Sequence, residues 1–301
     1  MNLINALVVK SLPLVPKPLV RYFANRYIAG ETLADAIRCV KEINAEGAVA
    51  TLDVLGEDIF TKEEAVESRQ KSVDVLHAIN KEKLDSNLSI KLTSLGLKLD
   101  KAFCVENVRE IMKVAAQYNI FVRIDMEDST ATTDTIDVFR ILHRDFPNTG
   151  IVLQGYLFRT MDDAQAMMND GMKNFRLCKG IYRESPTIAF QSREDVQKNF
   201  LAVLKRMFES KAYVGVATHD SVLVDGANTL IASMGLKKHE YEFQMLLGVR
   251  PELRSRLVKD GHKVRLYVPF GEHWYAYSLR RFKENPEIAG YVAKAVFMRN
   301  K

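Results

Sequence analysis

The 301-residue sequence is poor in cysteine and in blocks of like charge. Its three cysteines, Cys39, Cys104 and Cys178, are odd in number and far apart, which argues against a disulfide framework or a CxxC zinc site and favours a reducing compartment. No lysine and arginine cluster resembles a nucleic-acid arm, although the net charge is +5, so we expect no nucleic-acid partner. Cys178, near the end of an apolar run, is a candidate nucleophile, but such residues are usually small buried hydrophobes. We predict no metal site.

The N-terminal stretch MNLINALVVKSLPLVPKPLV lacks the features of an export signal. Lys10 and Lys17 interrupt the apolar run, three prolines break any helix, and no small-residue cleavage site follows. We therefore predict neither a signal peptide nor a membrane span, and we expect a cytoplasmic protein in which this arm packs on the domain. Because the segment is apolar and flanked by cations, peripheral contact with the inner face of the membrane is the alternative.

After a first helical pattern from Tyr22 to Glu46, short apolar runs alternate with amphipathic helical patterns. The eight runs are Ala48–Leu55, Ser89–Ser94, Phe121–Met126, Ile151–Tyr156, Asn174–Lys179, Tyr213–Thr218, Glu240–Leu246 and Lys263–Pro269. The helical patterns between them include Lys62–Asn80, Val105–Tyr118, Thr132–Phe146 and Asp195–Ser210. Alternation of this kind implies parallel strands joined by right-handed crossovers. Eight such units in roughly 250 residues are typical of a (β/α)8 barrel.

We predict a single α/β barrel domain over residues 47–301, preceded by an arm and helices over residues 1–46. A doubly wound sheet has the same alternation, but no GxGxxG turn follows the first strand, and there is no linker or low-complexity stretch. In β/α barrels the chemistry lies at the carboxyl ends of the strands, so the polar residues at those ends are the candidates for a site.

Polar side chains lie in or directly after most of the predicted strands. They are Lys91, Asp125, Gln154, Arg176, Lys179, Thr218, His219, Glu242, Gln244 and Tyr267. A lysine inside a buried strand is disfavoured unless it is paired, and Asp125 on the adjacent strand is the natural partner of Lys91. Any one of these residues has about even odds of being a satisfied structural group. Together they favour a large polar ligand, because each unsatisfied buried group costs roughly 1–3 kcal/mol.

The helix predicted after the eighth strand carries charges at the spacing of a core stripe. Tyr277, Arg280, Arg281 and Glu284 recur at i, i+3, i+4 and i+7. An exposed helix end would explain the charges but not their position next to further aromatic residues. We favour a lid that holds an anion with two guanidinium groups, because arginine binds carboxylate or phosphate as a planar fork.

Nine motifs occur along the chain in a characteristic order. They are LDVLGE, IKLTSLG, RIDMED, LQGY, RLCKGIY, ATHD, YEFQMLLGV, RLYVPFG and WYAYSLRRFKEN, within Ala48 to Asn285. The set resembles the monofunctional FAD-dependent proline dehydrogenases (proline oxidases) of bacteria, and the combination of EFQML, RxYVPxG and YxxRRxxEN is highly specific. The resemblance implies noncovalently bound FAD in a distorted (β/α)8 TIM barrel whose last helix caps the barrel mouth.

The resemblance assigns a pocket for L-proline at matching positions. Arg280 and Arg281 hold the proline carboxylate, Lys91 is a third cation nearby, and Asp125 is the carboxylate beside the lysine. Glu57 pairs with Arg280 and closes the site as an ion-pair gate, which leaves Arg281 as the more buried anchor. The walls of the pocket are Tyr182, Leu246, Tyr267 and Tyr277.

The resemblance also assigns residues to the cofactor. Arg176 matches a residue hydrogen-bonded near flavin N5, Gln154 contacts the isoalloxazine edge, and Glu284 lies near the ribityl chain. Two departures concern Ile181, where many relatives have alanine, and Glu184–Glu194, which differs from the bifunctional members near the adenosine end and leaves those contacts unassigned. The other cofactor contacts are Asp125, Lys179, Gly180, Thr218 and His219.

Oxidation of a secondary amine to an imine moves a hydride from the carbon next to nitrogen to flavin N5, after the nitrogen has lost its proton. The protein has mainly to orient the substrate, and Arg176 stabilises the charge that grows on the reduced flavin. No residue stands out as a committed general base, since the pairing of Asp125 with Lys91 favours an electrostatic role. We expect a quinone or another electron acceptor and a separate Δ1-pyrroline-5-carboxylate dehydrogenase, because the sequence has no room for an aldehyde dehydrogenase domain or a DNA-binding module.

Three other functions stay open at this point. A Schiff-base aldolase with Lys91 or Lys179 as nucleophile explains the buried lysine but not the arginine pair. A noncatalytic amino-acid-binding barrel explains the pocket and would be colourless. A hydroxyproline dehydrogenase retains the flavin, although the bulk of Tyr267 would crowd a ring hydroxyl and favours proline.

Overall fold

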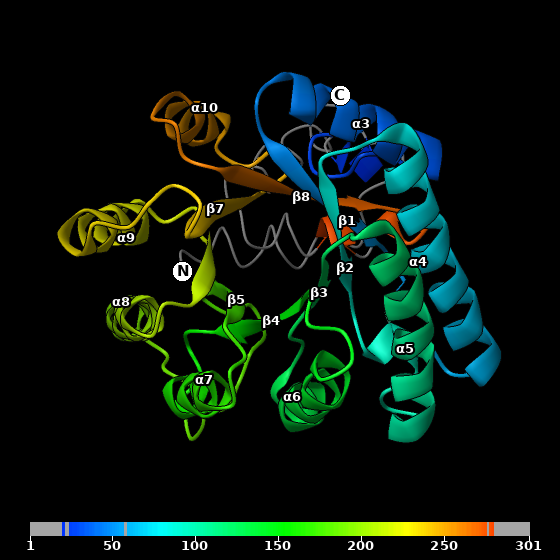
Figure 1. Cartoon of the computed structure of the whole chain (residues 1–301), viewed down its shortest axis with the longest axis horizontal. Helices are drawn as coiled ribbons and strands as arrows, with labels where there is room; N and C mark the ends of the chain where they lie inside the picture. Colours follow the sequence, from blue (N-terminus) through cyan, green and yellow to red (C-terminus); the bar gives the residue numbers. More distant parts are fainter. Residues whose placement is uncertain (1–19, 22–23, 57–58, 276, 280–301) are drawn as a thin grey trace, which may run out of the picture.

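The computed structural model describes residues 20–21, 24–56, 59–275 and 277–279. Within them, eight parallel strands form a closed barrel in chain order, and helices surround it (Figure 1). The strands are β1 Val49–Val54, β2 Ser86–Ile90, β3 Val122–Ile124, β4 Thr149–Gln154, β5 Asn174–Cys178, β6 Tyr213–Ala217, β7 Tyr241–Leu246 and β8 Val264–Phe270. The predicted α/β barrel is therefore confirmed.

Each crossover between strands carries a helix that covers the outside of the barrel (Figure 1). The helices are α3 Leu33–Ala45, α4 Lys62–Glu82, α5 Lys101–Tyr118, α6 Ser129–His143, α7 Thr160–Asn169, α8 Arg193–Glu209, α9 Ser221–Met234 and α10 Pro251–Lys259. Capping boxes begin two of them: Thr32 and Asp35 bond each other's backbone amides before α3, as Thr61 and Glu64 do before α4. No helix in the described part of the chain is long and apolar enough to span a membrane.

The barrel closes where β8 pairs with β1 over six residues, from Val49 opposite Arg265 to Val54 opposite Phe270. Helices cover the sheet from outside and side chains fill it from inside, so the strands are buried on both faces. The inside nevertheless contains several buried charged residues. They are Asp53, Arg123, Asp125, Arg176, Glu242 and Arg265.

Three sequence-based boundaries were wrong. The second strand ends at Ile90, because residues Thr93–Leu95 form a short 3₁₀ helix that Gly96 ends in the left-handed conformation, so Lys91 lies just after the strand. The eighth strand does not break at Pro269 but continues to Phe270, and the Pro269 carbonyl accepts a hydrogen bond from the Ala29 amide. The helical pattern from Tyr22 does not continue to Glu46 as one helix, because Gly30, at φ 145°, precedes α3.

Candidate active site

A cavity of about 820 Å³ lies at the carboxyl ends of the strands. Twelve of the predicted site residues line it: Lys91, Asp125, Gln154, Arg176, Lys179, Gly180, Tyr182, Thr218, His219, Leu246, Tyr267 and Tyr277. The other four, Glu57, Arg280, Arg281 and Glu284, lie outside the described residues. The structure thus gathers residues from seven strand ends around one space, which we call the substrate cavity.

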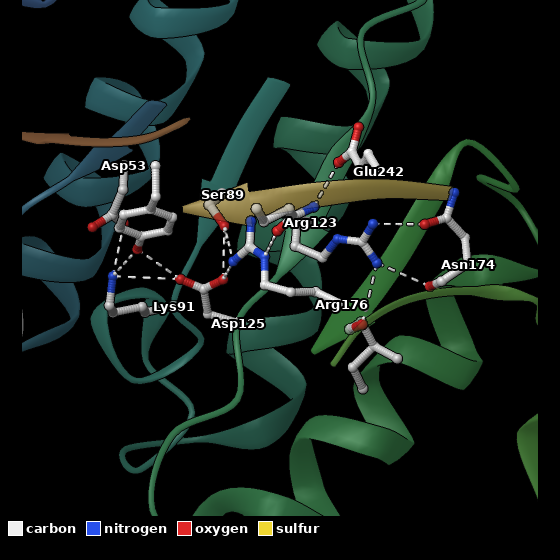
Figure 2. A network of polar contacts seen from close by, with 11 residues as sticks. Asp53, Ser89, Lys91, Arg123, Asp125, Asn174, Arg176 and Glu242 are labelled. Carbon is white, nitrogen blue, oxygen red and sulfur yellow. Dashed lines mark hydrogen bonds and ion pairs between the residues drawn. The ribbon is translucent and has the colours of Figure 1, made fainter. Parts of the chain in front are cut away.

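Lys91 lies at the centre of a polar network at this mouth (Figure 2). Its Nζ donates to Asp53 Oδ1 at 2.7 Å and to the Tyr267 hydroxyl at 3.0 Å, and it lies 3.6 Å from Asp125 Oδ2. The predicted partner, Asp125, is therefore present, but Asp53 is the closer carboxylate. We refer to Asp53, Ser89, Lys91, Asp125, Arg176 and Tyr267 as the mouth cluster.

Asp53, in β1, was not among the predicted site residues. Its side chain is 2% exposed, and its Oδ2 has no hydrogen-bond partner among the described residues. Burial raises the pKa of Asp53 to about 6, although the charge of Lys91 opposes this shift. The signal for it was available in the LDVLGE motif, where one aspartate interrupts an otherwise apolar run.

Asp125, by contrast, is held by several donors. Its Oδ1 accepts from the Ser89 hydroxyl and from Arg176 Nη1, each at 2.7 Å, and its Oδ2 accepts from the Tyr267 hydroxyl at 2.9 Å. Burial alone would raise the pKa of Asp125, but Arg176, Lys91 and these hydrogen bonds hold it below its ordinary value. Burial also raises the pKa of Tyr267 far above its ordinary value, so the phenol keeps its proton.

Arg176 connects the mouth cluster to the interior of the barrel. Its Nε donates to Gln244 Oε1 at 2.5 Å, and Gln244 Nε2 in turn donates to Glu242 Oε1 at 2.6 Å. The carboxylate therefore fixes which way the amide points. Gly215 leaves the space for this amide, because a Cβ there would lie 2.3 Å from Gln244 Nε2. Gln244 was noted as a polar strand residue but was not assigned to the site.

A second buried group of charges lies nearer the amino ends of the strands, and Figure 2 shows how it adjoins the first. We call Arg123, Asn174, Tyr213, Glu242 and Arg265 the base cluster. Arg265 donates to both oxygens of Glu242, at 2.7 and 3.1 Å, and the Tyr213 hydroxyl donates at 2.9 Å. Burial alone would raise the pKa of Glu242, but Arg265 above all lowers it to about 2.

Arg123, also in the base cluster, bonds only neutral acceptors among its described partners. It donates to the carbonyl and side-chain oxygens of Asn174, at 2.9 and 2.6 Å, and to the Ile151 carbonyl at 3.2 Å. Burial lowers the pKa of Arg123 to about 9. Gly150 makes room for it, since a Cβ there would lie 2.3 Å from the guanidinium.

Residues 36–294 match the family model described as proline dehydrogenase. The chain is 38% identical to proline dehydrogenase 1 of Bacillus subtilis subsp. natto over 92% of its own length and 91% of the relative's. It is 34% identical to the proline dehydrogenase of Deinococcus radiodurans, over 91% and 89%. The chain belongs to the proline dehydrogenase family. It is an oxidoreductase that acts on the CH–NH group of proline, in the first step of proline catabolism.

A solved structure shows the same fold at larger scale. Proline utilization A from Bdellovibrio bacteriovorus, inactivated by N-propargylglycine, superposes with a TM-score of 0.82 at 24% identity. The match covers 87% of the present chain and 32% of that structure's chain, so the chain spans about a third of it. Membership of the proline dehydrogenase family implies a flavin-dependent enzyme and does not support the aldolase alternative.

The substrate cavity suits a large, flat, partly anionic group such as a flavin nucleotide. Apolar side chains and cations share its wall, which matches a ring system joined to phosphates. Gly180, at φ 108°, closes part of the wall, and a Cβ there would lie 2.2 Å from the Tyr156 ring, so only glycine fits. The apolar residues include Met126, Val152, Ala217 and Met245, and the cations include Arg176, Lys179 and Arg193.

The predicted cofactor residues are held by their neighbours in this wall. Gln154 Nε2 donates to the Glu127 carbonyl at 2.9 Å, and His219 Nε2 accepts from the Leu246 amide at 2.9 Å. Lys179 Nζ lies 3.5 Å from Asp220. Among the described residues no group of three or more metal-ligating side chains occurs.

Two residues singled out in the sequence have different fates in the wall. Ile181 is 41% exposed and lines the cavity, so the residue at this departure from the family does reach the site. Cys178 also lines it, but burial raises the pKa of its thiol to about 11, which does not support a nucleophilic role. Glu184, in the second departing segment, accepts from the Ser129 amide and hydroxyl at the start of α6.

Proposed function

We propose that the protein oxidises L-proline to Δ1-pyrroline-5-carboxylate with noncovalently bound FAD, which when bound would take the hydride at N5 from the ring carbon next to nitrogen. The observation that carries this proposal is the substrate cavity, where a cation-rich polar network lies beside an apolar wall suited to the flavin. Proline is a small zwitterion with an apolar ring, and a cavity with both kinds of surface can orient it.

The carboxylate of proline would be held by cations. Lys91 is the described member of this set, and its pairing with Asp53 keeps the ammonium fixed at the mouth. Arg280 and Arg281 would complete the set, with Glu57 closing the site through Arg280. The ring would lie among Tyr182, Leu246, Tyr267 and Tyr277, which line the cavity.

Arg176 would lie near flavin N5 and stabilise the negative charge that grows during reduction. Its cation is kept in place by Asp125 on one side and by Gln244 on the other. Asp125 would therefore act by electrostatics and orientation. Gln154, Lys179, Gly180, Thr218, His219 and Glu284 would contact the rest of the cofactor.

The reduced cofactor would pass its electrons to a quinone or another acceptor. The product would be consumed by a separate Δ1-pyrroline-5-carboxylate dehydrogenase. A quinone lies in the membrane, which would give the apolar N-terminal residues a role in peripheral membrane contact.

The visible spectrum of the purified protein tests this function. Absorption at about 450 nm, as for an oxidised flavin, should disappear when L-proline is added without oxygen. Hydroxyproline is the matched control, since it should bleach the flavin more slowly if Tyr267 crowds the ring hydroxyl. Folded, freshly purified protein without flavin, or flavin that proline leaves oxidised, would contradict the proposal.

A variant tests the carboxylate anchor. Arg281→Met should weaken proline use by at least about 2–3 kcal/mol of transition-state binding, because a desolvated carboxylate loses its charged partner. The measurement is kcat/KM for proline, and an unaltered value would refute the role of Arg281.

A further inference from the structure

A second, smaller cavity of about 200 Å³ lies behind Lys91. Lys91 lines both this side cavity and the substrate cavity, whereas Asp53 lines the side cavity. The outer wall of the side cavity is polar and includes Ser68 and Ser72 on α4. The Lys91–Asp53 pair therefore separates the substrate cavity from a second polar space.

The proposed reaction requires a proton acceptor, on which this inference rests. A protonated amine has an ordinary pKa of about 10, so bound proline arrives with a proton that must leave before its nitrogen can form a double bond to carbon. Asp125 is a poor acceptor, because its two oxygens already accept three hydrogen bonds. Tyr267 donates its own proton to Asp125. Asp53 is different, because its buried Oδ2 has no hydrogen-bond partner in the described part of the chain.

We propose that Asp53 takes the amine proton of the substrate through Lys91 and releases it to water in the side cavity. The N–H bond of the substrate breaks as Lys91 Nζ receives that proton and gives one of its own to Asp53, 2.7 Å away. Lys91 keeps its positive charge and Asp53 becomes neutral. The electron pair left on the substrate nitrogen then forms the C=N bond, as the hydride leaves for the flavin of the proposed function.

The charges around Asp53 are consistent with a group that both takes and returns a proton. Burial and Asp125 raise its pKa and Lys91 lowers it, with the result at about 6. A carboxyl group poised near neutral pH can act as a general base in turnover. The titratable groups that face it are Lys91, Asp125 and Tyr267 inside the barrel, and Glu64, Glu67, Lys71, Glu272 and His273 around the side cavity.

The pH dependence of Asp53→Asn tests the route. At pH 7 its kcat for proline should be at least about 100-fold below that of the unaltered enzyme, within the usual range for a lost acid–base group. The deficit should shrink about tenfold per pH unit as the amine deprotonates in solution, while KM changes little. Asp125→Asn is the matched control, because it also removes a carboxylate beside Lys91; its deficit should be the same at every pH.

Infrared difference spectra during a pH titration of the flavin-loaded protein give a readout that does not depend on turnover. The carbonyl stretch of a protonated, buried carboxyl group should appear as the pH falls through about 6. It should be present in Asp125→Asn and missing in Asp53→Asn. Its persistence in Asp53→Asn would overturn the assignment.

A second variant keeps the route testable if Asp53→Asn does not fold. Ser68→Leu places bulk in the side cavity without touching the substrate cavity. It should lower kcat about tenfold, with unchanged KM, and increase the solvent deuterium isotope effect, because proton release becomes limiting. Flavin that proline fails to bleach would defeat the proposed function itself. If proline bleaches it and both variants follow the pH profile of the unaltered enzyme, only the proton route is wrong.

Discussion

Two buried carboxylates in one barrel, Asp53 in the mouth cluster and Glu242 in the base cluster, differ sharply in their ionisation. Each is at most 2% exposed and each faces a cation. Burial raises the pKa of Asp53 to about 6, whereas Arg265, overcoming burial, lowers the pKa of Glu242 to about 2. Glu242 accepts from Arg265, Tyr213 and Gln244, while Asp53 has one oxygen without a partner among the described residues.

The difference shows how a barrel can use buried charge in two ways. At the base, hydrogen bonds to both oxygens compensate the desolvation of Glu242, so the charge is permanent and serves the structure. At the mouth, incomplete pairing leaves Asp53 close to the pH at which it exchanges a proton, which is typical of functional groups. The link between the two regions is Gln244, through which the fixed charge of Glu242 orients Arg176.

The largest effect should follow from breaking the base cluster. Glu242→Leu would leave Arg265 buried without its carboxylate, so the free energy of unfolding should fall by about 3–5 kcal/mol. Urea unfolding followed by circular dichroism measures it. Lys263→Met is the control, because Lys263 is 42% exposed and lies 3.6 Å from the same carboxylate, and it should change stability by less than about 1 kcal/mol. Equal losses in the two variants would contradict the distinction.

Removing a fully paired carboxylate at the mouth should mainly affect catalysis. Asp125→Asn leaves Lys91 and Arg176 without one of their charged partners. We expect kcat/KM for proline to fall by an amount equivalent to about 2–5 kcal/mol, as for truncation of a buried charge pair. Steady-state kinetics with flavin content as a control would measure it, and a loss below about 1 kcal/mol would show that Asp125 is not needed to position the cations.

The raised pKa of Asp53 predicts a pH-dependent stability. Its folded-state pKa of about 6 exceeds the unfolded value of about 3.9, so the folded protein binds this proton more tightly. That contribution to stability is fully present below about pH 4 and is lost as the pH rises through about 6. The free energy of unfolding of the unaltered protein, relative to Asp53→Asn, should therefore fall by about 2 kcal/mol between about pH 4 and about pH 7. Denaturant unfolding at four pH values tests the sign, and an opposite trend would mean that Asp53 is stably ionised.

The smallest effect should come from trimming one bond of the base cluster. Tyr213→Phe removes the hydroxyl that donates to Glu242 but leaves both bonds from Arg265. We expect a loss of about 1 kcal/mol in stability, the usual net worth of such a hydrogen bond. The rate of proline oxidation should stay unchanged. A slower rate at full stability would show that the base cluster reaches the chemistry through Gln244.

The sequence was sufficient to predict the barrel, because buried runs and amphipathic helices alternate in it without interruption. It also indicated that Lys91 needs a buried partner, but it pointed to Asp125 and not to the closer Asp53. Which carboxylate is nearest depends on how far each strand extends, and the second strand ended earlier than its residues suggested. The direction of the Gln244 amide is likewise set by Glu242 and by the space at Gly215, which no single stretch of sequence shows.

The pairing of β8 with β1 also has a consequence for how the protein folds. Lys91 and Tyr267 are 176 residues apart in the chain, and their contact requires the first and last strands to meet. Contacts between distant segments form slowly, because the intervening chain must be ordered first. The mouth cluster is therefore assembled only when the barrel closes. In a refolding experiment, recovery of proline-dependent flavin bleaching should coincide with the slowest phase and lag behind recovery of helix content.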